Sequence, residues 1–183
     1  GVYVLTVTDP SNGCTAQASA TVDLDIAAPD ALAQGDTLTC AVPSIALAGS
    51  TSINNPEWLW TGPNNFISVE QNPDTDQPGT YLLTVTNLDN GCTSTATTNM
   101  EMNVVAPVSS ANTGILTCTI DSLTLTGVAD VASNFEWTGP NGYTFSGSDA
   151  IVVAPGDYSL VSTALGNGCR DSILVTVGQD IVA

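Results

Sequence analysis

The sequence predicts an all-β protein built from tandem β-sandwiches of about seven strands each. One stretch occurs three times, as GVYVLTVTDPSNGC at 1–14, GTYLLTVTNLDNGC at 79–92 and GDYSLVSTALGNGC at 156–169. Apolar residues alternate with other residues in each copy, which is the period of a half-buried strand. Between the copies, turn residues interrupt the chain at short intervals, and no stretch shows the period of a helix. These features indicate repeated all-β units.

Each copy of the repeated stretch predicts a β-hairpin whose first strand is led by a tyrosine, Tyr3, Tyr81 or Tyr158. An Asn-Gly pair follows the alternating residues, and Asn-Gly favours the positive φ angles of a tight two-residue turn. We therefore expect the chain to reverse at each Asn-Gly pair and to return as the last strand of a repeat. The tyrosine is typical of a tyrosine corner, in which the hydroxyl binds the backbone a few residues upstream.

The cysteines after these turns set the repeat length, since 92 − 14 = 78 and 169 − 92 = 77 residues. This period divides the 183 residues into three segments. Residues 1–27 form the C-terminal hairpin of an incomplete repeat, and residues 28–105 and 106–183 form two complete repeats. An Ala-Pro pair marks the start of each complete repeat, where proline ends a strand ladder because it lacks an N–H group. An isolated hairpin is marginal in water, so we expect the chain to be an excerpt of a longer protein.

The strands expected in 28–105 are short runs of alternating residues bounded by Gly, Pro and Asn. They cover 37–40, 44–49, 57–61, 66–69, an extended stretch up to Gly79, and the two strands of the hairpin. The same order recurs in 106–183 from Ile115 onwards. Ser162 and Asp171 stand at inward-facing positions of the last hairpin, so we expect a bulge or lower stability there.

Nine of the ten aromatic residues occupy equivalent positions in different repeats, which indicates structural roles. We expect Trp60 and Trp137 to fill the cores of two sandwiches. A glycan-binding module needs exposed aromatic platforms. Phe66, Tyr143 and Phe145, near the predicted turns, are the candidates for such a surface.

The chain carries eighteen acidic residues, one arginine, and no lysine or histidine, for a formal net charge of −17. No cationic surface is available to displace counterions from phosphates, which excludes nucleic acid as a partner. The charge also opposes binding to an anionic membrane, and no apolar run in this segment is long enough to span one. Carboxylates are the acid–base groups that remain, and the glutamates do not recur in register, so we expect no enzymatic activity.

The five cysteines allow two pairings that fit the repeat. We favour pairing within each repeat, namely Cys40 with Cys92 and Cys118 with Cys169. This choice leaves Cys14 for a residue outside the chain, and it follows because the first and last strands of an immunoglobulin-like sandwich lie side by side. The alternative joins neighbouring repeats, Cys14 with Cys40 and Cys92 with Cys118. Either pairing implies an oxidising, extracellular compartment.

Four aspartates surround the boundary between the first two segments, namely Asp23, Asp25, Asp30 and Asp36. Oxygen-rich clusters bind calcium, so these residues are candidate Ca²⁺ ligands. At the second boundary only two of the four equivalent positions keep an oxygen-bearing side chain. This difference favours a solvated acidic surface over a calcium site, and we expect no other cofactor.

Four motifs carry a resemblance to a known family: Leu-Thr-Cys, Trp-Thr-Gly-Pro-Asn, Pro-Gly-Thr-Tyr-Leu-Leu-Thr-Val-Thr and Asn-Gly-Cys-Thr. They are similar to the immunoglobulin-like, PKD-related repeats of very large cell-surface proteins of Bacteroidota. That family includes adhesins linked to gliding motility and exported by the type IX secretion system. The resemblance covers the whole chain and implies a secreted, surface-displayed filament or stalk.

We expect the chain to be a structural segment of a bacterial adhesin filament, stabilised by one disulfide per repeat and continued by further repeats of the same polypeptide. A host or substrate surface would then be bound through domains outside this segment. The alternative is a glycan- or surface-binding module that uses the turn-side aromatic residues. A third hypothesis is that like chains assemble side by side into a fibre in which calcium bridges their acidic faces.

Overall fold

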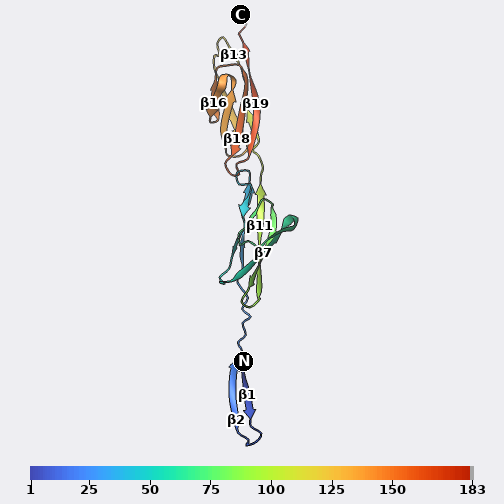
Figure 1. Ribbon diagram of the computed structural model, residues 1–183. Coiled ribbons are helices and arrows are strands. Elements are labelled where there is room, and N and C mark those ends of the chain that lie inside the picture. The colour runs from blue at the N-terminus through green and yellow to red at the C-terminus, as the bar shows by residue number, and fades with distance from the viewer. Residues whose placement is uncertain (182–183) are drawn as a thin grey trace.

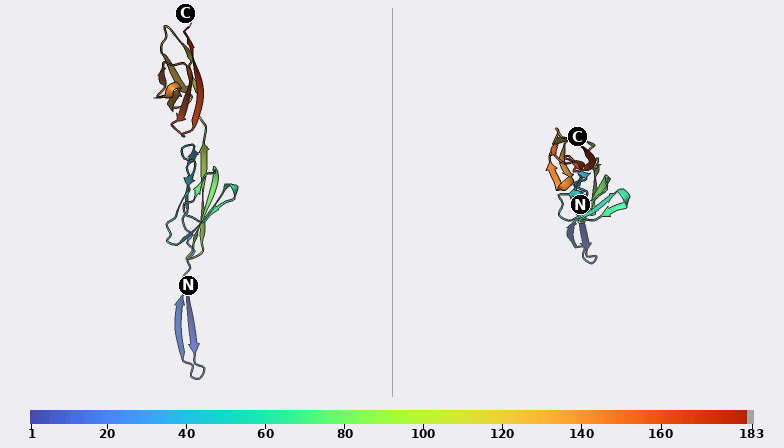
Figure 2. Two further views of the ribbon diagram at one scale, coloured as in Figure 1. Left: turned by 45° about the horizontal axis from the view of Figure 1, so that its top comes forward. Right: turned by 90° about the horizontal axis from the view of Figure 1, so that it is seen from above.

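The computed structural model of the chain describes residues 1–181. A β-hairpin and two β-sandwiches follow one another in a row (Figure 1). Seen from above, the same segments project onto a small area, so the molecule is elongated along one direction (Figure 2). Its helical elements within residues 1–181 are two single turns, η1 (Pro63–Asn65) and η2 (Pro140–Gly142). No helix in this range has the length and apolar composition needed to cross a membrane.

The N-terminal hairpin pairs β1 (Val2–Thr8) with β2 (Thr15–Thr21) in antiparallel register. The chain reverses where predicted, but it uses residues 9–14 and not a tight two-residue turn. Gly13 has a positive φ angle of 75°, whereas Asn12 does not share it. The Asn12 side chain instead accepts a hydrogen bond, at 2.9 Å, from the backbone N–H group two residues later. The same five- or six-residue reversal recurs in the other two copies.

The middle sandwich contains strands β3 to β11. Its smaller layer consists of two antiparallel pairs: β3 (Leu32–Gln34) with β6 (Ala48–Ser50), and β5 (Ile45–Ala46) with β9 (Asp74–Thr75). The larger layer is one sheet in the order β4 (Thr37–Thr39), β11 (Thr93–Asn103), β10 (Gly79–Asn87), β7 (Pro56–Gly62) and β8 (Phe66–Ser68).

The C-terminal sandwich repeats this arrangement with strands β12 to β19. Its smaller sheet has the order β12 (Ser109–Ala111), β14 (Leu123–Ala129) and β17 (Asp149–Val152). Its larger sheet has the order β13 (Gly114–Thr117), β19 (Arg170–Asp180), β18 (Gly156–Ala164), β15 (Ser133–Gly139) and β16 (Tyr143–Ser146).

The first strand of each sandwich is divided between the two layers. Its first part, β3 or β12, pairs antiparallel with β6 or β14. Its second part, β4 or β13, crosses to the other layer and pairs parallel with the last strand, β11 or β19. Two layers with this strand order form an immunoglobulin-like β-sandwich, so the predicted fold class is confirmed.

Each sandwich encloses one apolar core. The middle core consists of Leu38, Leu47, Trp60, Tyr81, Leu83, Val85 and Met100. The C-terminal core consists of Leu116, Leu125, Trp137, Ala150, Val152, Tyr158, Leu160, Val175 and Val177. Trp60 and Trp137 are fully buried, as predicted. Removing about 200 Å² of such a side chain from water contributes about 5 kcal/mol.

Both sandwiches also contain the predicted tyrosine corner. The Tyr81 hydroxyl donates a hydrogen bond to the backbone carbonyl of Gln77 at 2.9 Å. The Tyr158 hydroxyl donates in the same way to Ala154, also at 2.9 Å. Each bond fixes the corner before β10 or β18 to the strand that follows it.

The predicted bulge in the last hairpin is absent from the described residues. Strands β18 and β19 pair without interruption from Gly156 to Thr163. Ser162 is fully buried at the position that Val85 occupies in the middle sandwich. Asp171, opposite Ser162 in the ladder, accepts a hydrogen bond from the backbone N–H group of Ser109 at 3.0 Å. A regular strand therefore accommodates both polar residues.

Candidate functional site at the junction of the two sandwiches

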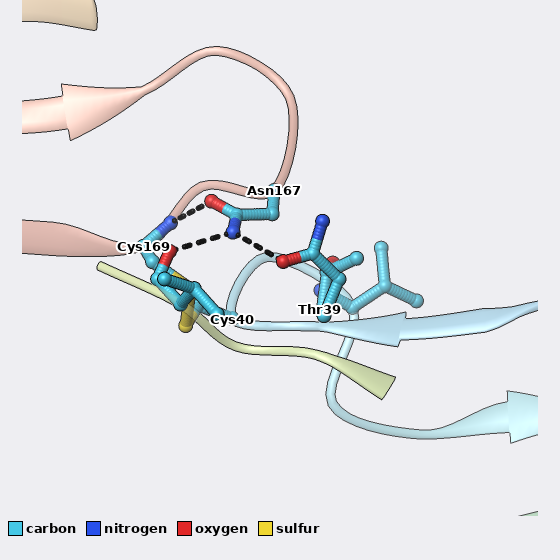
Figure 3. Close-up of a disulfide and its surroundings, with 7 residues drawn as sticks. Thr39, Cys40, Asn167 and Cys169 are labelled. Carbon is cyan, nitrogen blue, oxygen red and sulfur yellow. Dashed lines mark hydrogen bonds between the residues drawn. A yellow bond between two sulfur atoms is a disulfide. The ribbon is translucent and has the colours of Figure 1, made fainter. Parts of the chain in front are cut away.

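A disulfide joins the two sandwiches. Cys40, directly after β4, is bonded to Cys169, directly before β19, with a Cα–Cα distance of 5.0 Å. The two residues are 129 positions apart in the sequence. The bond lies where the end of the middle sandwich meets a hairpin turn of the C-terminal one (Figure 3). It is therefore a link between repeats.

This bond shows that the favoured pairing, Cys40 with Cys92 and Cys118 with Cys169, was wrong. The first and last strands do lie side by side as expected, but they run parallel, with Thr39 opposite Asn103. Cys40 consequently lies beside the far end of β11, whereas the other proposed partner lies before its start. The distance along the strand is 103 − 92 = 11 residues, or about 36 Å.

The alternative pairing between repeats, Cys14 with Cys40 and Cys92 with Cys118, was also wrong. It placed the bond correctly across a junction but joined other cysteines. Cys14, Cys92 and Cys118 are unpaired within residues 1–181.

Asn167 supports the disulfide through three hydrogen bonds of its side chain. Its Oδ1 accepts from the backbone N–H group of Cys169 at 3.0 Å. Its Nδ2 donates to the backbone carbonyl of Val105 at 2.9 Å and to Oδ1 of Asn103 at 3.0 Å. The side chain thus binds the cysteine on one side and the link between the sandwiches on the other (Figure 3).

The backbone adds a fourth contact across the junction. The N–H group of Ala41 donates to the carbonyl of Asn167 at 3.1 Å. Gly168 lies so close that a Cβ atom there would meet the Ala41 Cβ at 2.6 Å. The φ angle of Gly168 is also positive, at 70°. Glycine is therefore required at this turn both for its conformation and for the close approach of the two sandwiches.

The junction between the hairpin and the middle sandwich uses the same asparagine contacts. Oδ1 of Asn90 accepts from the backbone N–H group of Cys92 at 2.9 Å. Nδ2 of Asn90 donates to the backbone carbonyl of Ala27 and to Oδ1 of Asp25, both at 3.0 Å. Sequence reasoning treated the Asn-Gly pairs as turn formers and missed this role. The available signal was an oxygen-bearing residue, Asp25 or Asn103, within or directly before each link.

Three of the four candidate calcium ligands make separate hydrogen bonds within the protein. Asp25 binds Asn90, and Oδ1 of Asp36 accepts from the backbone N–H group of Thr37 at 2.7 Å. Asp23 lies in the link that follows β2. Among residues 1–181, no three His, Cys, Asp or Glu side chains are grouped so as to hold a metal ion.

Asp30, the fourth candidate, binds Thr51 and Ser52 at the start of the middle sandwich. Its Oδ1 accepts hydrogen bonds from the Ser52 hydroxyl at 2.6 Å and the Ser52 N–H group at 2.8 Å. The Thr51 hydroxyl donates to the same oxygen at 3.1 Å. The hydrogen bonds from Ser52 to the charged form lower the pKa of Asp30 from 3.8 to about 2.

Two of the three candidate glycan-binding aromatics pack against the corner tyrosines. The rings of Phe66 and Tyr81 meet edge to face with centroids 5.2 Å apart, and those of Tyr143 and Tyr158 with centroids 5.5 Å apart. The Tyr143 hydroxyl also donates a hydrogen bond to the backbone carbonyl of Ile151 in β17 at 2.9 Å. Phe145 is 38% exposed and stands opposite a core tryptophan in the ladder of β15 and β16. Phe66 and Tyr143 therefore make structural contacts, whereas Phe145 remains partly exposed.

The fold and the junction define a class of protein, tandem immunoglobulin-like β-sandwiches joined end to end and cross-linked by a disulfide. No protein-family model matches the chain, and no curated protein sequence matches it.

Solved structures of several tandem immunoglobulin-like proteins are similar to the chain. A three-domain structure of titin has 12% identity and a TM-score of 0.41, and the match covers 85% of this chain and 67% of that one. The three N-terminal domains of the outer capsid protein Hoc of bacteriophage RB49 have 10% identity and a TM-score of 0.47, with 83% and 58% covered. The four N-terminal domains of a Dscam1 isoform have 10% identity and a TM-score of 0.37, with 98% and 55% covered. The chain thus spans little more than half of the Hoc and Dscam1 structures.

Proposed function

We propose that the chain is a tension-bearing segment of a long extracellular stalk, in which residues 28–105 and 106–183 are successive structural repeats. The observation that carries this proposal is the Cys40–Cys169 disulfide between two sandwiches arranged end to end. A bond in this position does little for the inside of either sandwich. It does determine how force passes from one sandwich to the next.

The disulfide shortens the covalent path that a pulling force follows. Force applied at the two ends passes along the chain to Cys40, crosses the bond, and continues from Cys169 through β19. Residues 41–168, which form most of both sandwiches, lie in a closed loop outside this path. Unfolding of that loop would release no length.

From residue 32 onwards, beyond the N-terminal hairpin, the shortened path is also close to full extension in the folded state. Residues 32–39 and 170–180 are mostly β-strand, and a strand already rises about 3.3 Å per residue, near the limit of an extended chain. A stalk built in this way transmits force without lengthening. The parallel pairing of β4 with β11 makes this possible, because it brings Cys40 to the end of the sandwich that faces the next one.

We place this segment outside the cell. A disulfide between cysteines 129 positions apart, like other structural disulfides, is typical of an oxidising, extracellular compartment. The resemblance of four sequence motifs to the repeats of Bacteroidota surface proteins supports the proposed place in a cell-surface adhesin. We assign the chain a mechanical and not a catalytic role, and we assign target binding to domains outside this segment.

Single-molecule stretching between handles on the two termini tests the proposal. The path through the disulfide contains 40 − 1 = 39 and 183 − 169 = 14 residues, which reach about 190 Å at about 3.5 Å per residue. The whole chain of 183 residues reaches about 640 Å at the same rise. We expect the oxidised chain to stop near the shorter length and a C40S/C169S variant to reach more than three times that length.

A C118S variant is the matched control, since it removes an unpaired cysteine and should stretch like the unaltered chain. Small-angle scattering of the oxidised chain is the second measurement, and the proposal expects an elongated particle. Two outcomes contradict the stalk: a particle in which the sandwiches are folded against each other, or a protein from an oxidising compartment that extends to the full length because the bond has not formed.

A further inference from the structure

The three unpaired cysteines occupy positions equivalent to the two halves of the junction disulfide. Cys14 and Cys92 end Asn-Gly-Cys turns, as Cys169 does, and Cys118 ends a Leu-Thr-Cys strand, as Cys40 does. Equivalent sequence alone does not make a cross-link site. The surroundings of Cys92 and Cys118, however, reproduce those of the bonded cysteines in detail.

The turn that carries Cys118 has the hydrogen bonds of the turn after β4. In that turn the N–H group of Thr39 donates to the carbonyl of Val42 at 2.9 Å, and the N–H group of Val42 donates to the Thr39 hydroxyl at 3.0 Å. Around Cys118 the same two bonds join Thr117 and Ile120, at 2.8 and 3.0 Å. Strand β13 also pairs parallel with the last strand of its sandwich, as β4 does. The cysteine is therefore held at the end of its sandwich and is exposed there.

The turn that carries Cys92 likewise matches its bonded counterpart. Asn90 binds the link that precedes the middle sandwich through the same three side-chain hydrogen bonds that Asn167 makes. One contact differs between the two turns. A Cβ atom at Gly168 would meet Ala41 of the neighbouring sandwich, whereas a Cβ atom at Gly91 meets no heavy atom of residues 1–181 within 4 Å. The surface beside Cys92 is thus open to a chain placed as Ala41 is.

We propose that Cys118 and Cys92 are cross-link sites for adjacent repeats of the same kind. Cys118 bonds the cysteine of an Asn-Gly-Cys turn in a following repeat, and Cys92 bonds the cysteine of a Leu-Thr-Cys strand in a preceding one. Cys14 belongs to the same class as Cys92. The inference rests on the proposed stalk and extends it, because each repeat then holds both of its neighbours.

Formation of each bond is a balanced two-electron oxidation. Two thiol sulfurs join, two protons are released, and two electrons pass to an oxidant of the disulfide class, such as glutathione disulfide, which is reduced to two thiols. The resulting loops overlap along the chain, since Cys92 and Cys118 both lie inside the loop that Cys40 and Cys169 close. A single broken bond would therefore leave the neighbouring junctions cross-linked.

A lengthened chain tests the inference, with residues 106–183 repeated once after Ala183. The chain is refolded in glutathione buffer, alkylated, and mapped by non-reducing peptide analysis. We expect Cys118 to be linked to the counterpart of Cys169 in the added repeat, to the same extent as Cys40 is linked to Cys169. The matched control is C118S, in which that counterpart should become fully alkylated while the Cys40–Cys169 bond persists.

The outcomes separate this inference from the stalk itself. An alkylated Cys118, or a Cys118–Cys169 bond within one repeat, overturns the recurrence of the cross-link. If Cys40 and Cys169 remain bonded in that sample, the stalk proposal is unaffected, because it depends on the Cys40–Cys169 bond alone. If the Cys40–Cys169 bond is also missing from a folded chain, both proposals fail.

Discussion

Asn167 donates a hydrogen bond from its side-chain Nδ2 to the backbone carbonyl of Val105 at 2.9 Å, although 62 residues separate the two in the sequence. Val105 belongs to the link between the sandwiches, and Asn167 belongs to a hairpin turn of the second one. This bond fixes the direction in which the link enters the C-terminal sandwich. It also keeps the turn in the place where its cysteine meets Cys40.

The first prediction concerns the side-chain hydrogen bonds of Asn167. N167A removes the three side-chain hydrogen bonds of a residue that is 8% exposed, which destabilises the junction by roughly 2 kcal/mol. That loss corresponds to about a 30-fold fall in the equilibrium constant for forming the Cys40–Cys169 bond in a glutathione buffer. This equilibrium constant is measured by titrating the oxidised fraction of the protein against the ratio of reduced glutathione to glutathione disulfide. N12A is the control, because Asn12 lies in the N-terminal hairpin, where its Oδ1 accepts the equivalent turn bond from the N–H group of Cys14. An equal effect of both variants would show that the contacts of Asn167 across the junction are not the cause.

The second prediction ranks three tyrosine-to-phenylalanine variants. Y158F removes one hydroxyl bond, to Ala154, and should destabilise the C-terminal sandwich by about 1 kcal/mol. Y81F should have the larger effect, roughly 2 kcal/mol, since the Tyr81 hydroxyl also bonds Thr75 at 2.6 Å and Thr75 is buried. Y3F should have none, because Tyr3 is exposed. Urea unfolding of each variant gives the order, and a Y3F effect as large as that of Y81F would show that the corner bonds are not the cause.

These tyrosines were predictable because the signal is local. Alternation of residue types placed Tyr81 and Tyr158 on the inward face of a strand, and recurrence identified Trp60 and Trp137 as core residues. Such patterns depend on the period of a strand, which the sequence displays directly. The two-layer fold follows from the same patterns.

The disulfide was not predictable from the same information. The repeat pattern shows which strands are neighbours, but the spacing of Cys40 and Cys92 does not reveal whether the first and last strands run parallel or antiparallel. That direction is set when the first strand crosses from one layer to the other between Gln34 and Thr37. It decides which end of the sandwich holds Cys40, and therefore which cysteine it meets.

The third prediction concerns Ser162. Its hydroxyl is buried and finds no hydrogen-bond partner within residues 1–181, whereas Val85 fills the same position in the middle sandwich. S162A removes an unsatisfied polar group without adding volume and should stabilise the C-terminal sandwich by about 1 kcal/mol. The reciprocal variant V85S should destabilise the middle sandwich by roughly 2 kcal/mol or more. Thermal unfolding measures both, and a less stable S162A would mean that the hydroxyl has a partner in solution.

The fourth prediction concerns acid. Hydrogen bonds from Ser52 lower the pKa of Asp30 from 3.8 to about 2. The charged carboxylate therefore stabilises the folded middle sandwich fully at pH values above 3.8. The contribution must disappear as the pH falls from about 4 to 2, because the folded protein then has to accept a proton that the unfolded chain already carries. We expect the protection of β10 against hydrogen exchange to fall more steeply over this range in the unaltered chain than in D30N, in which residue 30 no longer titrates.

The comparison within one pH series removes the general effect of the net charge of −17, since both chains lose charge together as their other carboxylates are protonated. D149N provides the matched control in the other sandwich, because hydrogen bonds from Thr126 and Ser148 lower the pKa of Asp149 as well. D149N should change how the hydrogen-exchange protection of β18 falls between pH 4 and 2, and it should leave the protection of β10 unchanged. Parallel curves for the unaltered chain and D30N between pH 4 and 2 would mean that Ser52 does not hold the Asp30 carboxylate in solution.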